Sequence, residues 1–247
     1  MKLVLNGGGD GKSVESARQL LNGLIDNNKK ILYIPFAWPD STYNGCLEFM
    51  TSELSDVDKL GIDKESVLRS EVYTRYIDDN HVLRTMASTM VPRGLQSIKD
   101  DINPNNLLAC VGLVYRRDQI DRIHSGVHHQ LDLWYTSDKP VTEKDLENMI
   151  NIIVKVVTGD TNTKYEVIPK IHPYTLKGRE IDVIWNDKPI EILECGIANP
   201  KILKENGCKG YGLALGLGLE RILMVRKNIK DIRLLRSENE KVKCDIA

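Results

Sequence analysis

What the 247-residue sequence lacks narrows the kind of protein that it encodes. Its five cysteines form neither a CxxC pair nor a cluster with histidine at metal-ligand spacing, which argues against a zinc site. No apolar run is long enough for a signal peptide or a membrane span, and the apolar stretch near the C-terminus is interrupted by Glu220 and Arg221. A net charge of −1 gives no basic field that would draw the chain onto nucleic acid. We therefore expect a folded, cytoplasmic protein with no membrane partner.

The composition that remains is typical of a globular protein with a hydrophobic core. Hydrophobic residues make up 41% of the chain and charged residues 28%, a balance that disordered chains do not reach. The length allows one large or two modest domains. Because the pattern changes near residue 65, we divide the chain into a short α/β segment at 1–65 and a domain at 66–247.

The segment 1–65 reads as strand, helix, strand, helix. The apolar run 2–5 stops at a glycine triplet, after which Ser13 is expected to cap a helix. A second strand is expected at 31–35, and the second helix should end at Gly61. The apolar face of that second helix is expected to carry Leu47, Met50 and Leu54.

The glycine run GGGDGKS has some likeness to a phosphate-binding loop, but GxxxxGK[ST] requires glycine where the chain has Asn6. We interpret it as a strand-to-helix turn. The stretches LVLNGGG and ILYIPFA resemble the first two strands of the peptidase E (S51) family, over residues 1–62. No GxSxG serine nucleophile follows anywhere in the chain, so hydrolase activity is not expected.

The domain at 66–247 has one clear helix among strands. Thr142 and Asp145 form a capping-box pattern at its start, and Gly159 ends it. A second helix is expected from Leu219 onward. Strands are expected at residues 107–118, 128–136, 180–185, 189–193 and 210–218.

Polar side chains converge on the first of these hairpins. Alternation along a strand puts Arg116 and Asp118 on one face, and Gln130 and Asp132 share a face of the partner strand. The connecting loop adds His124. So many polar groups on one sheet are costly unless a ligand or water satisfies them. A structural ion-pair network on a solvated face is the alternative reading.

The sequence GLGLER places Arg221 in the first turn of the helix that follows a glycine-rich strand. A helix N-terminus favours anions, and the glycines at 216 and 218 permit close approach of a ligand. Glycines in strands more often serve packing, so this pattern is weak by itself.

Taken in order, four motifs resemble one family. They are YRRDxxDxxHSxxHHQxD, HPYTxxGxEIDV, CGxxNP and GLALGLGLERILM. Their order resembles the catalytic core of the phenylalanyl-tRNA synthetase α-subunit, and is closer still to small stand-alone paralogues of that subunit, presumed ligases of unassigned substrate. The resemblance spans residues 70–236. It implies an α+β fold of the class II aminoacyl-tRNA synthetase type, an antiparallel sheet flanked by helices, preceded here by the α/β segment.

The resemblance implies a ligase that uses ATP to activate an amino acid as its aminoacyl-adenylate and then joins it to an unidentified acceptor. Arg116 would bridge the substrate carboxylate and the α-phosphate, and Arg221 would hold the γ-phosphate. Asp118 matches the acidic residue near the adenine, and His124 matches the loop residue at the distal phosphates. Glu191 is a further candidate for the ATP site.

Magnesium and subunit partners are less clearly implied. Glu191 and Glu180 are candidates to help hold Mg²⁺ through the ATP phosphates. The glutamate by which the α-subunit shares magnesium with its β partner is Leu176 here, which fits a protein that works without that partner. The motif that builds the class II dimer interface would fall before residue 70, so a homodimer stays an open expectation.

The amino-acid site departs from that of the family. Gln130 and Asp132 fall where the family binds the substrate ammonium, and Ser88 matches a polar contact there. In the side-chain pocket the family has Phe-Pro-Phe, where this chain has a histidine, a proline and a tyrosine. The pocket residues are His172, Tyr174 and Ala214, with Thr175 beside them. Hydrogen-bonding walls penalise an apolar ligand, so a polar or differently shaped amino acid is a better expectation than phenylalanine. An ordinary packed histidine at position 172 is the alternative.

Other functions stay open at this point. One is aminoacylation of tRNA in the manner of a phenylalanine–tRNA ligase, with tRNA possible as a partner but not favoured by charge. Another is a non-catalytic protein that senses an amino acid or nucleotide. Such a sensor would not need a complete phosphate clamp, and the chain keeps all four candidate residues: Arg116, Asp118, His124 and Arg221.

Overall fold

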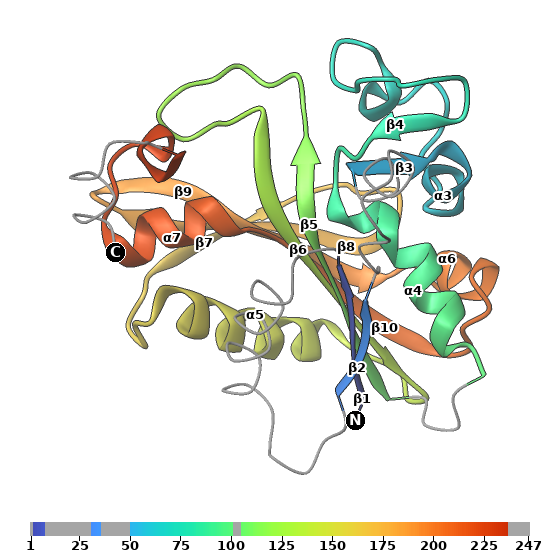
Figure 1. The fold of residues 1–247 in the computed structure, drawn as a ribbon. Coiled ribbons are helices and arrows are strands. Elements are labelled where there is room, and N and C mark those ends of the chain that lie inside the picture. Colours follow the sequence, from blue (N-terminus) through green and yellow to red (C-terminus); the bar gives the residue numbers. More distant parts are fainter. Residues whose placement is uncertain (1, 8–30, 36–49, 101–104, 237–247) are drawn as a thin grey trace.

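The computed structural model describes residues 2–7, 31–35, 50–100 and 105–236, and its centre is one eight-stranded sheet (Figure 1). The strand order is β2-β1-β5-β6-β10-β9-β8-β7. From β5 to β7 all neighbours are antiparallel, whereas β1 and β2 extend the β5 edge in parallel. The bounds are β1 Lys2–Gly7, β2 Ile31–Pro35, β5 Asn106–Tyr115, β6 Val127–Ser137, β7 Tyr165–Pro169, β8 Thr175–Trp185, β9 Lys188–Ala198 and β10 Tyr211–Gly218. The predicted α+β class with an antiparallel sheet is confirmed.

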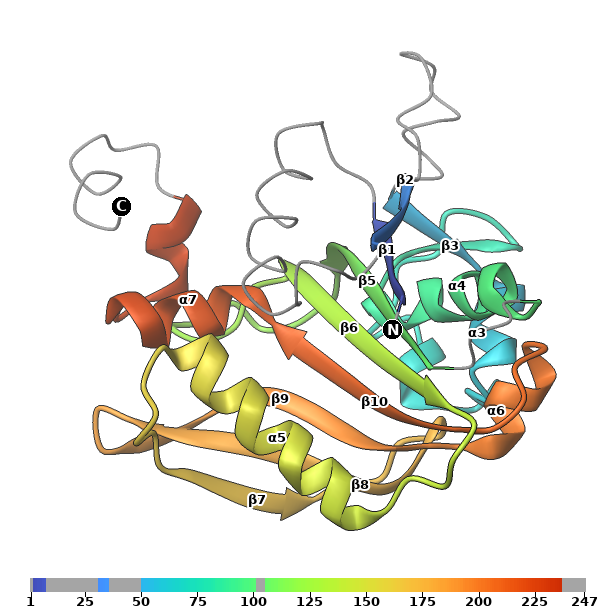
Figure 2. The ribbon, with the colours of Figure 1, turned by 90° about the horizontal axis from the view of Figure 1, so that it is seen from below.

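One face of the sheet is covered by α5, Glu143–Thr158, which lies across the strands in Figure 2. The capping box is present, since the Thr142 hydroxyl accepts from the Asp145 amide and the Asp145 carboxylate accepts from the Thr142 amide. Gly159 ends the helix with a left-handed φ of 73°, which glycine adopts at little cost. Leu146 and Ile150 of α5 are buried against sheet residues such as Leu215. This helix was predicted with the correct ends.

The opposite face carries shorter helices. These are α3 Leu54–Lys59, η2 Ala87–Met90, α4 Val91–Ile98 and α6 Pro200–Glu205. Strand alternation divides the two cores, because Leu108 of β5 packs with Leu95 and Trp134 on this face while Ala109 faces α5. Beyond β10 the chain forms α7, Leu219–Lys227, which contacts α5, and then the short helix η3, Ile232–Arg236.

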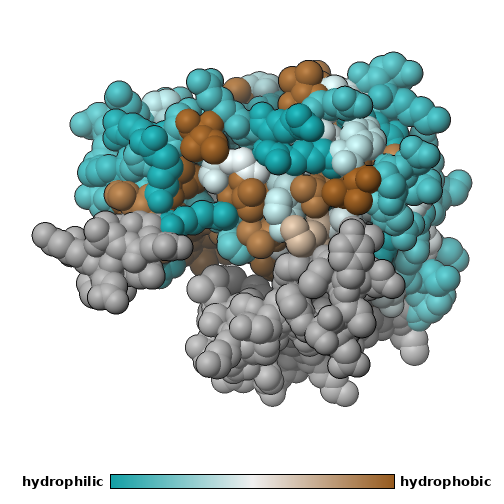
Figure 3. Space-filling model, turned by 45° about the horizontal axis from the view of Figure 1, so that its top comes forward, coloured by the Kyte–Doolittle hydropathy of each residue, from teal (hydrophilic) through white to brown (hydrophobic). Residues whose placement is uncertain are grey.

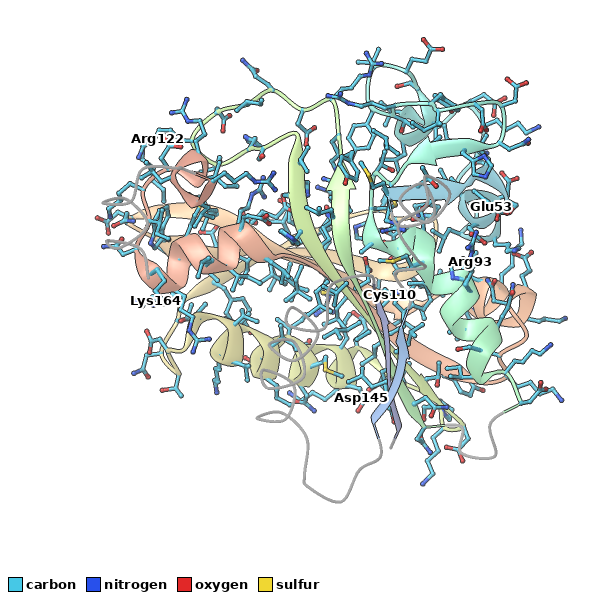
Figure 4. All side chains as sticks on the ribbon, viewed as in Figure 1. Glu53, Arg93, Cys110, Arg122, Asp145 and Lys164 are labelled. Atoms are coloured by element: carbon cyan, nitrogen blue, oxygen red, sulfur yellow. The ribbon has the colours of Figure 1, made fainter. Side chains whose placement is uncertain are left out.

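Residues 50–83 form a small subassembly beside α4. Here β3, Thr51–Glu53, pairs with β4, His81–Leu83, and η1 spans Val67–Arg69. Arg93 of α4 reaches across to this part and binds Glu53 at 2.8 Å and Asp56 at 2.7 Å; Figure 4 shows Arg93 and Glu53 side by side. Val57 of α3 also packs into the core that contains Leu95. The ion pairs and this apolar contact tie the subassembly at 50–83 to α4 and to the core beneath that helix.

Several predicted elements differ in extent from the structure. The second helix was expected to include Met50 and Leu54. Both residues are helical, but residues 51–53 between them pair with β4, and α3 begins at Leu54. Strand pairing satisfies the backbone there, and it outweighs the helical spacing of the apolar residues. The strand expected at 107–118 stops at Tyr115, and β8 begins five residues before position 180. The predicted Ser13 helix and Leu47 lie outside the described residues. The division at residue 65 remains a prediction.

Candidate active site

A cavity of about 620 Å³ opens on the face of the sheet that bears η2 and α4, a size in the range of small-molecule sites. Apolar surface gathers toward the middle of the molecular face in Figure 3, with hydrophilic residues around it. Strands β6, β9 and β10 form the floor of the cavity, and the loops after β5 and β7 form its walls. All but one of the predicted site residues line it: Ser88, Arg116, Asp118, His124, Gln130, Asp132, His172, Tyr174, Glu191, Ala214 and Arg221.

Arg116 and Arg221 come from distant parts of the chain and face this one cavity. Arg116 directly follows β5; its Nε donates to the Thr85 carbonyl at 2.8 Å, and its guanidinium lies 5.5 Å from the centre of the Tyr73 ring. Arg221 lies in the first turn of α7, and its Nε donates to the Ile123 carbonyl at 3.1 Å. Backbone carbonyls thus fix both guanidinium groups while leaving them cationic. Two held cations that line one cavity suit a ligand with several phosphate groups.

Acidic residues and a histidine surround these arginines. Glu191 accepts from Arg221 Nη1 at 3.0 Å. His124 Nδ1 lies 2.8 Å from Asp121, whose carboxylate also accepts from two backbone amides of the same loop. These backbone and histidine hydrogen bonds hold the pKa of Asp121 below its ordinary value. The loop is therefore shaped by Asp121, and it presents His124 to the cavity.

The other end of the cavity is built on a buried carboxylate. Asp132 of β6 has only 4% of its surface exposed and accepts a hydrogen bond from the Ser88 hydroxyl at 3.0 Å. Burial, together with the nearby charge of Glu194, raises the pKa of Asp132 to about 7. The Ser88 hydrogen bond acts in the opposite direction and lowers this pKa. Gln130, two residues earlier, accepts from the Ala87 amide at 3.1 Å. Short helix η2 is thereby docked on β6 through both polar side chains.

Strand register brings a second carboxylate close to Asp132. In β10, Gly216 pairs with Asp132 of β6 on one side and with Glu194 of β9 on the other. A β-carbon at Gly216 would lie 3.5 Å from an Asp132 carboxylate oxygen. The glycine therefore leaves an open floor between two acidic side chains, and both of them line the cavity.

Glu194 is held by residues of the loop between β7 and β8. His172 Nε2 lies 3.2 Å from Glu194 Oε2, and His172 Nδ1 lies 3.0 Å from the Thr175 hydroxyl. Lys170 Nζ lies 3.2 Å from Glu194 Oε1 and also binds Glu180. The His172 ring stacks on Tyr174, with ring centres 5.8 Å apart. His172 is thus both a packed residue and part of the cavity wall, so the two readings of it are not exclusive.

Glu180 is the predicted site residue that does not line the cavity. It lies on β8 opposite Glu194, and its carboxylate is engaged by Lys170. Among the described residues no group of three or more His, Cys, Asp or Glu side chains is arranged to hold a metal ion. Glu191 is consequently the better placed of the two candidates for a phosphate-bound cation.

Comparison with known proteins now identifies the chain's relatives. Residues 46–244 match the family model described as the tRNA synthetases class II core domain (F). The chain belongs to this family. The match begins 20 residues before the domain start predicted at position 66. Within the described residues, no helix has the length and apolar character needed to cross a membrane.

Relatives of this class II core are named phenylalanine–tRNA ligase alpha subunit. That of Prochlorococcus marinus subsp. pastoris is 33% identical over 185 residues, which cover 74% of this chain and 53% of that protein. That of Nostoc sp. is 30% identical over 218 residues, covering 87% and 62%. The chain thus spans between about half and three fifths of these relatives. The crystal structure of pyrrolysyl-tRNA synthetase from Desulfitobacterium hafniense has the same fold, with a TM-score of 0.60 at 17% identity, over 77% of this chain and 65% of that one.

Among the cavity residues that were not predicted from the sequence, four lie beside the predicted ones. Tyr73 lies under Arg116, Lys170 and Glu194 form the ion pair described above, and His128 lines the wall near Arg116. Burial lowers the pKa of His128 to about 4, and the charge of Arg116 adds to this, so its imidazole is neutral at neutral pH. Glu194 directly precedes the CGxxNP motif, which was the available signal. Its role, however, depends on the pairing with Gly216, which only the fold defines.

Proposed function

We propose that this chain uses ATP to activate an amino acid as its aminoacyl-adenylate. The observation that carries the proposal is the convergence of Arg116, Arg221 and Asp132 on one cavity. The first two can bind the phosphates and the substrate carboxylate, and the third can bind the substrate ammonium. Membership of the class II synthetase family supports the same chemistry.

In the proposed reaction, an oxygen of the amino-acid carboxylate attacks the α-phosphorus of ATP. A new phosphorus–oxygen bond forms, the bond to the β-phosphate oxygen breaks, and pyrophosphate leaves with the bonding electrons. Arg116 would neutralise the charge shared by the carboxylate and the α-phosphate, which grows in the transition state. Arg221 would hold the distal phosphates in place. Asp118 and His124 would contact the nucleotide from the loop after β5, as the family resemblance implies.

Asp132 and Gln130 would orient the amino acid. An ammonium group bound at Asp132 favours the ionised carboxylate, so substrate binding would pull its pKa down from about 7. Ser88 would keep the carboxylate oriented through its hydrogen bond. The amino-acid carboxylate would then point from Asp132 toward Arg116, which lines the same cavity.

A magnesium ion bound to ATP fits the residues at the phosphate end. Mg²⁺ is commonly held by one or two carboxylates together with substrate phosphates, and Glu191 lies beside Arg221 to provide one. When bound, the ion would neutralise phosphate charge. The residues offer no separate all-protein cage within the described part of the chain.

The test is ATP–pyrophosphate exchange with two variants and a matched control. Arg116→Ala and Arg221→Ala should each lower exchange more than tenfold, about 1.4 kcal/mol or more. Arg117→Ala is the control, because Arg117 adjoins Arg116 but is exposed and outside the cavity. Unchanged exchange in both cavity variants would reject the assignment.

For the acceptor, tRNA is the first to test, because the curated relatives are named as tRNA ligases. Charging of total tRNA with radiolabelled amino acid would establish it. Exchange without charging would instead indicate a small-molecule or protein acceptor, and ATP binding without exchange would indicate a sensor. Size-exclusion chromatography would separately decide whether the chain forms a homodimer.

A further inference from the structure

The cavity contains an anionic residue that amino-acid activation does not use. Asp132 is sufficient to bind the substrate ammonium, yet Glu194 lies across Gly216 from it and faces the same space. Glu194 keeps 33% of its side chain exposed, and that exposure is to the cavity it lines. A carboxylate beside the ammonium site must therefore be accommodated by whatever side chain the substrate carries.

Glu194 is fixed in place and ionised. Burial alone would raise its pKa, but the hydrogen bond from His172 and the charge of Lys170 outweigh burial and bring the pKa to about 2. His172 is itself held by Thr175 and stacked on Tyr174. One carboxylate oxygen is thus anchored by a rigid ring, and the other faces a flexible lysine.

That lysine has a second anionic partner. Lys170 binds Glu180 as well as Glu194, and its side chain is 42% exposed. If a substrate cation took the place of Lys170 at Glu194, Lys170 would remain neutralised by Glu180. Counted without His172, whose ring is a cation only when it is protonated, the group of Glu180, Glu194 and Lys170 has a net charge of −1, so one further cation would balance it. Asp132 does not contribute to this sum, because its charge is matched by the substrate ammonium.

We propose that the side-chain subsite selects an amino acid with a basic side chain, whose nitrogen donates to Glu194. This inference rests on the proposed function and names its substrate class. A charged nitrogen would complete the hydrogen bonding of the carboxylate and balance the cluster. An apolar side chain would shield Glu194 and its partners His172 and Lys170 from water without adding a donor of its own, and removing charged groups from water without compensation is disfavoured.

The first test compares amino acids on the unmodified protein. ATP–pyrophosphate exchange and direct calorimetry would be run with L-lysine, L-ornithine and L-arginine, against L-phenylalanine and L-norleucine. Norleucine is the sharpest comparison, since it has the four-carbon side chain of lysine without the terminal nitrogen. We expect the best basic amino acid to show a KM and a Kd at least tenfold below those of norleucine and phenylalanine.

The second test removes the charge and keeps the shape. Glu194→Gln should raise the KM for the basic amino acid tenfold or more while the KM for ATP changes less than threefold. Glu166→Gln is the matched control, because Glu166 is exposed on β7 and lies outside the cavity. A thermal melt of each variant would show that folding is retained.

The outcomes separate the two claims. If an apolar, acidic or neutral polar amino acid gives the lowest KM, the inference is overturned while the proposed function stands. If no amino acid supports exchange, the proposed function is overturned. Calorimetry then still tests the side-chain subsite. If lysine, ornithine and arginine do not bind more tightly than norleucine, the inference is overturned. An unchanged KM for the basic amino acid in Glu194→Gln also overturns it.

Discussion

The two ends of the cavity are built on different physical principles. At the proposed phosphate end, Arg116 and Arg221 extend from a loop and a helix start; backbone carbonyls position both, and Glu191 also binds Arg221. At the proposed amino-acid end, Asp132 and Glu194 rise from β6 and β9, the two strands that flank β10, and are held by side chains. Cations held in this way would suit the phosphate groups of a nucleotide, whatever its base. Carboxylates in a packed floor discriminate between substrates, because each needs a matching donor.

The amino-acid end also separates two carboxylates by their protonation. Burial and a like charge bring the pKa of Asp132 up to about 7, whereas a histidine and a lysine bring that of Glu194 down to about 2. Paired acidic groups with shifted pKa values in opposite directions have different roles in many active sites. In the proposed function, Asp132 would become ionised when the substrate ammonium binds, whereas Glu194 is an anion with or without substrate.

The largest effect that distinguishes the two ends is expected from Asp132→Asn. The amide keeps the size of the side chain but loses the charge-assisted hydrogen bond to the substrate ammonium, worth about 2 kcal/mol, or about thirtyfold in affinity. We expect the KM for the amino acid to rise by that factor and the KM for ATP to stay within threefold, both measured by pyrophosphate exchange. An equal rise in both values would show that the two ends are not separate.

A smaller effect on the amino-acid Kd is expected from a change of pH. Only the ionised form of Asp132 binds an ammonium group well, so the amino-acid Kd should rise about fivefold from pH 7 to pH 6 for a pKa of about 7. Calorimetry over pH 5.5 to 7.5 would measure this, and Asp132→Asn should give a flat profile. A slope that persists in the variant would assign the titration to another group of the cavity.

The same pKa shift makes the folded protein less stable as the pH rises, whereas amino-acid binding becomes tighter. The folded protein keeps a proton on Asp132 that the unfolded chain loses near pH 4, so this group contributes stability below that pH. The contribution declines as the pH rises toward 7 and is lost above it. Asp132 therefore trades stability at neutral pH for a carboxylate that is ready to bind a cation.

The elements that local signals define were predicted well. Helix α5 has a cap, an apolar face and a terminating glycine, each of which acts within a few residues. Strand β7 was missed because it is an edge strand with mostly exposed residues, ends in Pro169 and shows no alternation. Strand β3 was missed because its pairing with β4 is made by residues 30 positions away.

The residues of the candidate site also fall into those that local sequence predicted and those that it did not. Arg116 and Arg221 lie in motifs that can be read along the chain, and both were expected to meet at one ligand. Glu194 and Lys170 were not expected, because their importance comes from strand register across Gly216 and from a loop that folds back onto β9. Sequence reasoning finds residues that belong to recognisable motifs. It misses residues whose role depends on a neighbour that is distant in the chain.

The smallest effect is expected from substitution of Tyr73, which lies against Arg116 at the proposed phosphate end. Tyr73 contributes a ring face to Arg116, and a partly exposed cation–π contact is worth about 0.5–1 kcal/mol. Because the Thr85 carbonyl also holds this guanidinium, Tyr73→Leu should lower kcat/KM for exchange only about two- to fivefold, whereas Tyr73→Phe keeps the ring and should be near normal. Equal impairment of both variants would assign the effect to the tyrosine hydroxyl. A change confined to the amino-acid KM would place Tyr73 at the other end of the cavity.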